Sequence, residues 1–165
     1  INILKLQKLL YLADRESMRQ FGAPISFDNL VSLDHGPVLS RTLNLMNGGC
    51  GDRASSAHWE EWISDRSNYD LHLKRDFSRG DLDQLSDADL DVMESVWGQF
   101  GHMDRWTLRD YTHQNCAEWK NPNGSALEIT DESVFLALGV PAEQAAELGR
   151  QVKFERQMDA LLAKL

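Results

Sequence analysis

Apolar residues recur at steps of three and four over residues 4–21, which is the spacing of an amphipathic helix. These residues are Leu6, Leu9, Leu10, Ala13 and Phe21. Between Leu9 and Ala13 the pattern is apolar nearly all round, so we expect this helix to lie at the centre of the fold. Gly22 favours a helix end, and Pro24 prevents the helix from continuing.

The same spacing predicts shorter helices later in the chain. They are expected at residues 40–47, 86–100, 104–115, 130–139 and 141–165. Ser40 and Asp104 are candidate N-caps, and Ser86 with Asp89 has the spacing of a capping box. Pro141 suits the first turn of the last helix.

Strand signals are confined to the first half of the chain. Residues 29–34 favour a short strand, and residues 58–76 resemble a β-hairpin in which Tyr69, Leu71 and Leu73 alternate with polar residues. The polar stretch 50–57 is predicted to be a loop.

Between the first strand and the helix at residue 40, His35-Gly36-Pro37 is predicted to form a rigid strand-to-helix corner. Pro37 fixes its own φ, and Gly36 reaches backbone conformations closed to other residues. Taken together, the pattern predicts a single α+β domain over residues 1–165. It is mainly α-helical, with its helices packed on a small antiparallel sheet or hairpin.

Composition narrows the function classes. The net charge of −9 and the pI of about 4.9 argue against direct nucleic-acid binding, which needs a clustered positive surface. No apolar run approaches the roughly 20 residues of a membrane span, so we expect no membrane partner and a cytoplasmic location. The acidic balance is compatible with a basic protein partner.

Candidate chemistry is sparse. His113 and Cys116 form an H-x-x-C pair, and His102 lies eleven residues earlier, but no second close ligand pair completes a zinc site. A Cys/His nucleophile pair would need a further orienting group, and neither a nucleophile elbow nor a phosphate-binding glycine loop is present. We therefore predict no enzyme activity, no metal and no cofactor. A small hydrolase or metal-dependent enzyme that uses these residues and His35 remains an alternative.

An ordered set of motifs goes further than composition. The segment "LKLQKLLYLADRE" (4–16) is followed by Gly22 and Pro24, then "HGPVLSRTLNLM" (35–46), and later by residues 85–119. The last segment carries Phe100-Gly101, Leu108, Thr112-His113 and Trp119. In this order the motifs resemble the SocA-like or Panacea antitoxin domain, which also occurs in phage-associated proteins.

The resemblance implies the function that we expect. Such domains neutralise a cognate toxin by direct protein–protein contact, and one branch delivers its toxin to a AAA+ protease. An antitoxin is therefore the first hypothesis, and a proteolytic adaptor is the alternative. The candidate toxin-binding residues are an exposed face of the first helix, the His35 corner and two Trp residues of the expected hairpin. They are Lys5, Lys8, Arg15, Arg19, His35, Trp59 and Trp62.

Overall fold

The computed structural model describes residues 1–49, 53–64 and 67–162. Its helices are α1 (Ile3–Phe21), α2 (Ser40–Met46), α3 (Arg53–Trp62), α4 (Asp87–Phe100), α5 (Arg105–Asn115), α6 (Asp131–Ala137) and α7 (Ala142–Leu162), with a short 3-10 turn η1 (Arg79–Asp81). Its strands are β1 (Leu30–Leu33), β2 (Gly36–Leu39) and β3 (Leu127–Glu128). The prediction of a mainly α-helical α+β fold is confirmed.

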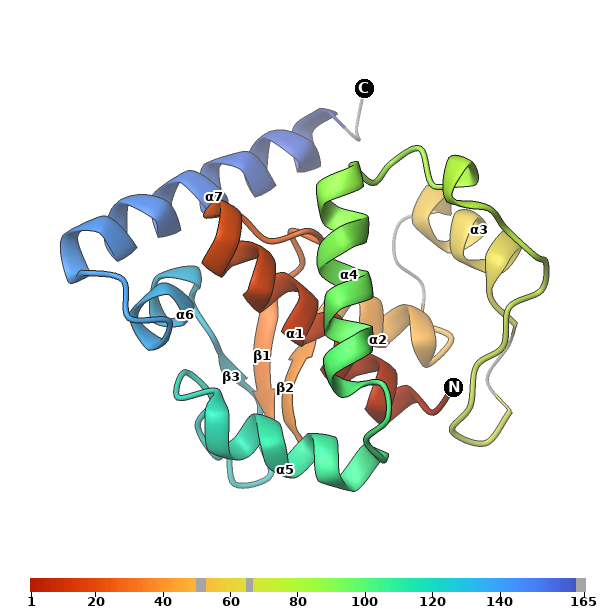
Figure 1. Cartoon of the computed structure of the whole chain (residues 1–165), viewed down its shortest axis with the longest axis horizontal. Helices are drawn as coiled ribbons and strands as arrows, with labels where there is room; N and C mark the ends of the chain where they lie inside the picture. Colours follow the sequence, from red (N-terminus) through yellow and green to blue (C-terminus); the bar gives the residue numbers. More distant parts are fainter. Residues whose placement is uncertain (50–52, 65–66, 163–165) are drawn as a thin grey trace.

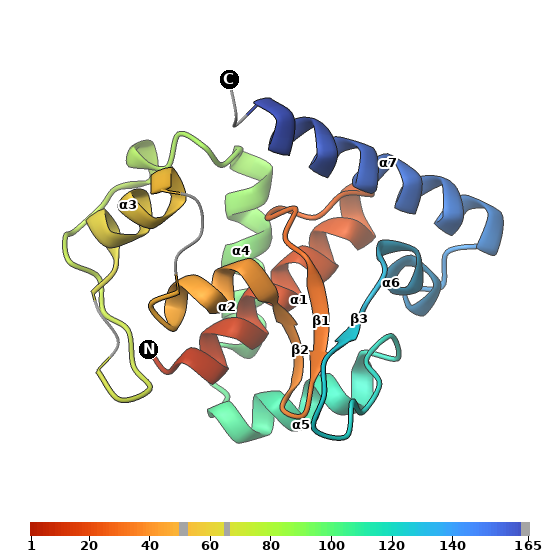
Figure 2. The same cartoon turned by 180° about the vertical axis from the view of Figure 1, so that it is seen from behind.

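Helix α1 runs through the centre of the fold, as its pattern predicted. Helix α4 crosses one side of it, the sheet lies on the opposite side, and α5 closes the bottom (Figures 1 and 2). The side chain of Asn2 caps the first turn, and Gly22 ends the helix with a φ of 77°. Being covered from several directions, α1 buries polar as well as apolar residues.

The sheet is antiparallel with the strand order β2-β1-β3, and Asp34 and His35 form the turn between β1 and β2. The predicted strand-to-helix corner is therefore wrong, since Pro37 belongs to a second strand, opposite Ser32. Pro37 is tolerated because β2 is an edge strand, where a missing backbone N–H costs no ladder bond on the open side.

Asp28, and not Ser40, caps helix α2. The backbone N–H groups of Arg41 and Thr42 donate to the two carboxylate oxygens of Asp28, at 2.9 and 2.8 Å. A side chain from twelve residues upstream thus replaces the local cap that the sequence suggested. The predicted caps at Ser86 and Asp104 are confirmed, because there the donor and acceptor are close neighbours in sequence.

The β-hairpin predicted at residues 58–76 is wrong in its first arm, which is the helix α3. Trp59, Trp62 and Ile63 fall at helical spacing, and Trp59 and Ile63 pack on a cluster of buried apolar residues. The chain then returns beside the helix end, where Ile63 and Leu73 form an isolated bridge in place of a regular strand pair. Residues 53–57 of the predicted loop are helical. Residues 50–52, and residues 65 and 66 of the predicted turn, lie outside the described residues.

The main core lies where α1, α4 and α5 meet α6 and α7. Its fully buried side chains include Tyr11, Leu108, Val134, Phe135 and Val152. Within the described part of the chain, none of the helices has both the length and the apolar character needed to cross a bilayer.

Candidate protein-binding surface

Two buried polar side chains of α1 fasten the helix to the β1–β2 hairpin. The Lys8 ammonium nitrogen donates to the carbonyl oxygen of Pro37 at 2.6 Å, and the backbone N–H of Leu39 donates to Gln7 Oε1 at 3.1 Å. Lys8 and Gln7 have exposed fractions of 0% and 1%. Both belong to the first family-like motif, so this motif has a structural role at these positions.

Gly36 is required where the hairpin approaches α1 and α5. A Cβ atom at this residue would lie 2.9 Å from Thr112 Oγ1 and 3.1 Å from the Lys8 Cε and Nζ atoms. Its φ of 98° is also in the region that favours glycine. The His35-Gly36-Pro37 segment therefore has a structural role, in which Gly36 lets the hairpin backbone lie close to side chains of α1 and α5.

The segment after α5 completes the attachment. The Tyr11 hydroxyl and the Arg15 Nε both donate to Glu118 Oε1, at 2.7 and 2.8 Å. Trp119 Nε1 donates to the Leu33 carbonyl at 3.0 Å, and its ring stacks on the ring of His113 with 3.9 Å between centroids. Motif residues far apart in sequence thus converge on one polar junction beneath the hairpin.

Burial governs the titration of this junction. Desolvation lowers the pKa of Lys8 to about 7 and raises the pKa of the Cys116 thiol to about 12, where the nearby Glu118 also contributes. Desolvation and nearby cations, Arg109 first, lower the pKa of His113. Cys116 is thus a neutral thiol at physiological pH and lacks the thiolate that nucleophilic catalysis uses. Within the described residues, no three His, Cys, Asp or Glu side chains are grouped to hold a metal ion.

The four basic residues predicted as one exposed face of α1 do not form such a face. Lys8 is completely buried, and Arg15 is mostly buried against Glu118. Lys5 donates to the Gly101 carbonyl at 2.6 Å, which leaves Arg19 as the one exposed member of this set, paired with Glu16 of its own helix. The sequence pattern was misleading because α1 is covered on several sides.

His35 lies exposed at the hairpin turn, next to a Trp residue that sequence reasoning missed as a surface residue. The ring centroids of His35 and Trp106 are 5.9 Å apart, and Trp106 is 45% exposed. The guanidinium carbons of Arg105 and Arg109 lie 5.2 and 5.0 Å from the Trp106 ring. Trp106 opens α5 and has no apolar periodicity around it that would have revealed it.

The two Trp residues of α3 differ in their surroundings. Trp59 packs against the buried residues Ile3, Met46 and Leu71, which is a structural position. Trp62 lies under the guanidinium of Arg75, at 3.5 Å from its ring centroid, and faces the ring of Phe77 at 6.3 Å. Only Trp62 of the two reaches the surface depression described next.

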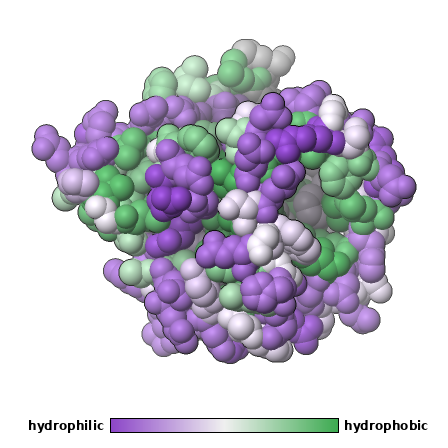
Figure 3. Space-filling model, in the orientation of Figure 1, coloured by the Kyte–Doolittle hydropathy of each residue, from purple (hydrophilic) through white to green (hydrophobic). Residues whose placement is uncertain are grey.

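This depression, the α1–α4 groove, has a volume of about 570 Å³ and an almost entirely apolar lining. Its side chains come from the N-terminus and α1, from α4, and from the end of α3 and the segment that follows it. They are Ile1, Leu6, Leu9, Leu10, Ala13, Trp62, Ile63, Leu73, Phe77, Leu82, Leu85, Leu90, Met93, Val96 and Trp97, with Glu94 at the margin. Hydrophobic surface is visible between α4 and the region of α3 in Figure 3.

Several groove residues are open to solvent despite their size. Trp97 and Leu73 are each 56% exposed, and Phe77 is 48% exposed. Trp97 follows Leu90 and Met93 at helical spacing in α4, a pattern that by itself indicates core packing. The helical period alone therefore could not reveal that this face continues past the core and onto the surface.

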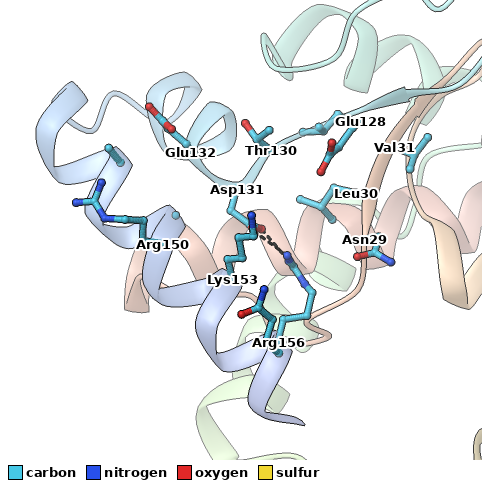
Figure 4. Close-up of a pocket in the computed structure, with 14 residues that line it drawn as sticks. Asn29, Leu30, Val31, Glu128, Thr130, Asp131, Glu132, Arg150, Lys153 and Arg156 are labelled. Atoms are coloured by element: carbon cyan, nitrogen blue, oxygen red, sulfur yellow. Dashed lines mark hydrogen bonds and ion pairs between the residues drawn. The ribbon is translucent and has the colours of Figure 1, made fainter. Parts of the chain in front are cut away.

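A second depression, of about 640 Å³, lies between β1, α6 and α7 and is lined by charged and polar side chains together with apolar ones (Figure 4). Arg156 of α7 points at Asp131 and donates to both of its carboxylate oxygens at 2.9 Å. Arg156 also donates to the Phe27 carbonyl at 3.0 Å. This arrangement ties α7 to α6 and to the loop before β1, which is a structural function.

The chain was compared with known proteins. The family model described as "Antitoxin SocA-like, Panacea domain" matches residues 6–120. This range runs from Leu6 within α1 to the segment after α5. It includes the polar junction and all of the α1–α4 groove except Ile1, and it leaves α6 and α7 outside. Neither the curated proteins nor the solved structures gave a match.

Proposed function

Since this chain belongs to the antitoxin SocA-like, Panacea domain family, we propose that it neutralises a cognate toxin by binding that toxin directly. The observation that supports this proposal is the α1–α4 groove, an open apolar surface on a strongly acidic protein. Contiguous exposed apolar surface of this kind is typical of protein-interaction sites.

The family-like motif residues support binding indirectly. Lys8, Gly36 and Glu118 are buried in the junction, so they shape the fold and leave contact to side chains at the surface. Trp62 and Trp97 are large aromatic side chains at the groove, and Trp is enriched among residues that dominate binding energy. The groove therefore offers both area and anchors.

The test is co-expression with the protein encoded next to this chain. The neighbouring protein alone should stop growth of the host, and co-expression with this chain should restore it. The two proteins should also elute together in size-exclusion chromatography. A neighbour that is harmless alone, or that remains toxic beside a well-expressed antitoxin, contradicts the proposal.

Toxin half-life separates two modes of neutralisation. Masking by direct binding leaves the half-life of the toxin unchanged, whereas delivery to a AAA+ protease shortens it when this chain is present. We expect masking, because binding of the toxin in the apolar groove would be enough to neutralise it, without a protease. A pulse-chase measurement with and without the antitoxin decides between the two.

A further inference from the structure

The walls of the α1–α4 groove determine which kind of partner segment fits it. Two walls are helices, whose backbone groups are bonded internally, so they offer side chains and no strand edge. On the third wall Ser64 and Lys74 donate their backbone N–H groups to His72 and Trp62, so this stretch pairs with itself. The geometry favours a helix laid into the groove over an added strand.

The dimensions are consistent with a helix. Helix α4 has 14 residues and is thus about 21 Å long. Apolar anchors at positions i, i+3, i+4 and i+7 of a partner helix span about 10 Å, so two turns fit along α4. The groove volume of about 570 Å³ is in the range of preformed binding sites.

The chain segment that supplies the groove wall after α3 and the first part of the α4 wall is strongly acidic. Residues 59–94 contain eleven Asp and Glu and four Lys and Arg, a formal charge of −7 (4 − 11), whereas the whole chain carries −9. Arg75 lies 2.8 Å from Glu61, and Arg79 lies 2.7 Å from Asp91, so these cations are already engaged by carboxylates nearby. Most of the net negative charge of the protein thus lies in a segment that supplies two of the groove walls.

From these observations we propose that the α1–α4 groove binds an amphipathic helix of the toxin that carries Lys or Arg beside its apolar face. This inference rests on the proposed antitoxin function and specifies the partner segment. Apolar anchors enter the groove, and the basic residues of the helix face the acidic side chains of residues 59–94. The charges raise the association rate and select the partner, while the apolar anchors supply affinity.

The first experiment measures binding of the purified neighbouring toxin to groove variants by calorimetry. Phe77→Lys and Leu73→Lys replace exposed groove residues, so both variants should fold, and each should raise the Kd at least about tenfold. The matched controls are Phe154→Lys and Leu162→Lys on α7, at 61% and 60% exposure, which should change the Kd less than about twofold. If one groove variant misfolds, the other still decides.

A second experiment tests the charge. Asp76→Lys near the groove should slow association with the toxin several-fold and reduce its salt dependence, whereas Asp159→Lys on α7 should do neither. Hydrogen exchange of the toxin in the complex should show protection of a helix with Lys or Arg next to apolar residues. A synthetic peptide of that segment should compete with the toxin.

The outcomes separate this inference from the proposed function. A toxin that is neutralised and binds the groove and control variants equally well overturns the inference and leaves the antitoxin function in place. Protection of an acidic helix or of an extended segment also overturns it, as does a dimer of this chain that dissociates in Phe77→Lys. Absence of any toxin binding contradicts the proposed function itself.

Discussion

Replacing Lys8 by Met tests whether burial of this side chain keeps its amine uncharged. In the folded protein the pKa of Lys8 is lowered to about 7, whereas in the unfolded chain it has its ordinary value of 10.5. Between these values the unfolded chain binds one more proton than the folded one, so stability rises as the pH rises. Below pH 7 the cost of burying the ammonium is fully present.

The size of the effect follows from the two pKa values. The cost of the buried ammonium at pH 6 is about 5 kcal/mol, and it falls by about 3 kcal/mol between pH 6 and pH 9. Lys8→Met removes this cost but also removes the donor to the Pro37 carbonyl, which costs roughly 1–3 kcal/mol. We therefore expect the variant to be more stable than the wild type at pH 6 and to lose most of that advantage by pH 9.

The measurement is urea denaturation of both proteins at several pH values from 6 to 9. Cys116 acts in the opposite direction above pH 9, because its pKa rises from 9.0 to about 12 on folding. It is present in both proteins, so the difference between their free energies of unfolding isolates Lys8. A difference that stays constant within about 0.5 kcal/mol from pH 6 to 9 refutes the reasoning.

Two further substitutions test the junction by urea denaturation. Gly36→Ala should lower the free energy of unfolding by more than about 2 kcal/mol, because the new Cβ would meet Thr112. The control Gly48→Ala should lower it by only about 1 kcal/mol, because Gly48 shares the positive φ but a Cβ there would have no atom within 4 Å. Equal losses in the two variants would contradict the close-approach argument. Tyr11→Phe should cost about 1–3 kcal/mol by removing a donor to the buried carboxylate of Glu118, and a neutral result would mean that this hydroxyl contributes nothing to the junction.

The features that could be predicted from sequence depend on near neighbours. The helix α1 follows from the spacing of its Leu residues, and the caps of α4 and α5 follow from Ser86 and Asp104, whose partners lie within three residues. The features that were wrong depend on distant ones. Strand β2 exists because Gly36–Leu39 pairs with β1, and α2 is capped by Asp28.

The same distinction applies to the candidate site. Lys8 looks like a surface residue in the sequence, but its Nζ donates a hydrogen bond to the carbonyl of Pro37, 29 residues later. No local pattern encodes that approach. Trp97 looks like a core residue until the fold leaves its side of α4 uncovered. The sequence shows that the groove residues are apolar. Their exposure to solvent depends on the distance in space between α4 and the segment after α3, which the sequence does not show.

The contact between Tyr11 and Glu118 also sets an order of events during synthesis. The two residues are 107 positions apart, so at translation rates of roughly 5–20 residues per second the ribosome needs roughly 5–20 s to go from one to the other. During that interval Lys8 and Gln7 can already meet Pro37 and Leu39, whereas Tyr11 and Arg15 lack the carboxylate that they bond in the folded protein. The nascent chain thus completes the packing around α1 only after Glu118 has been made.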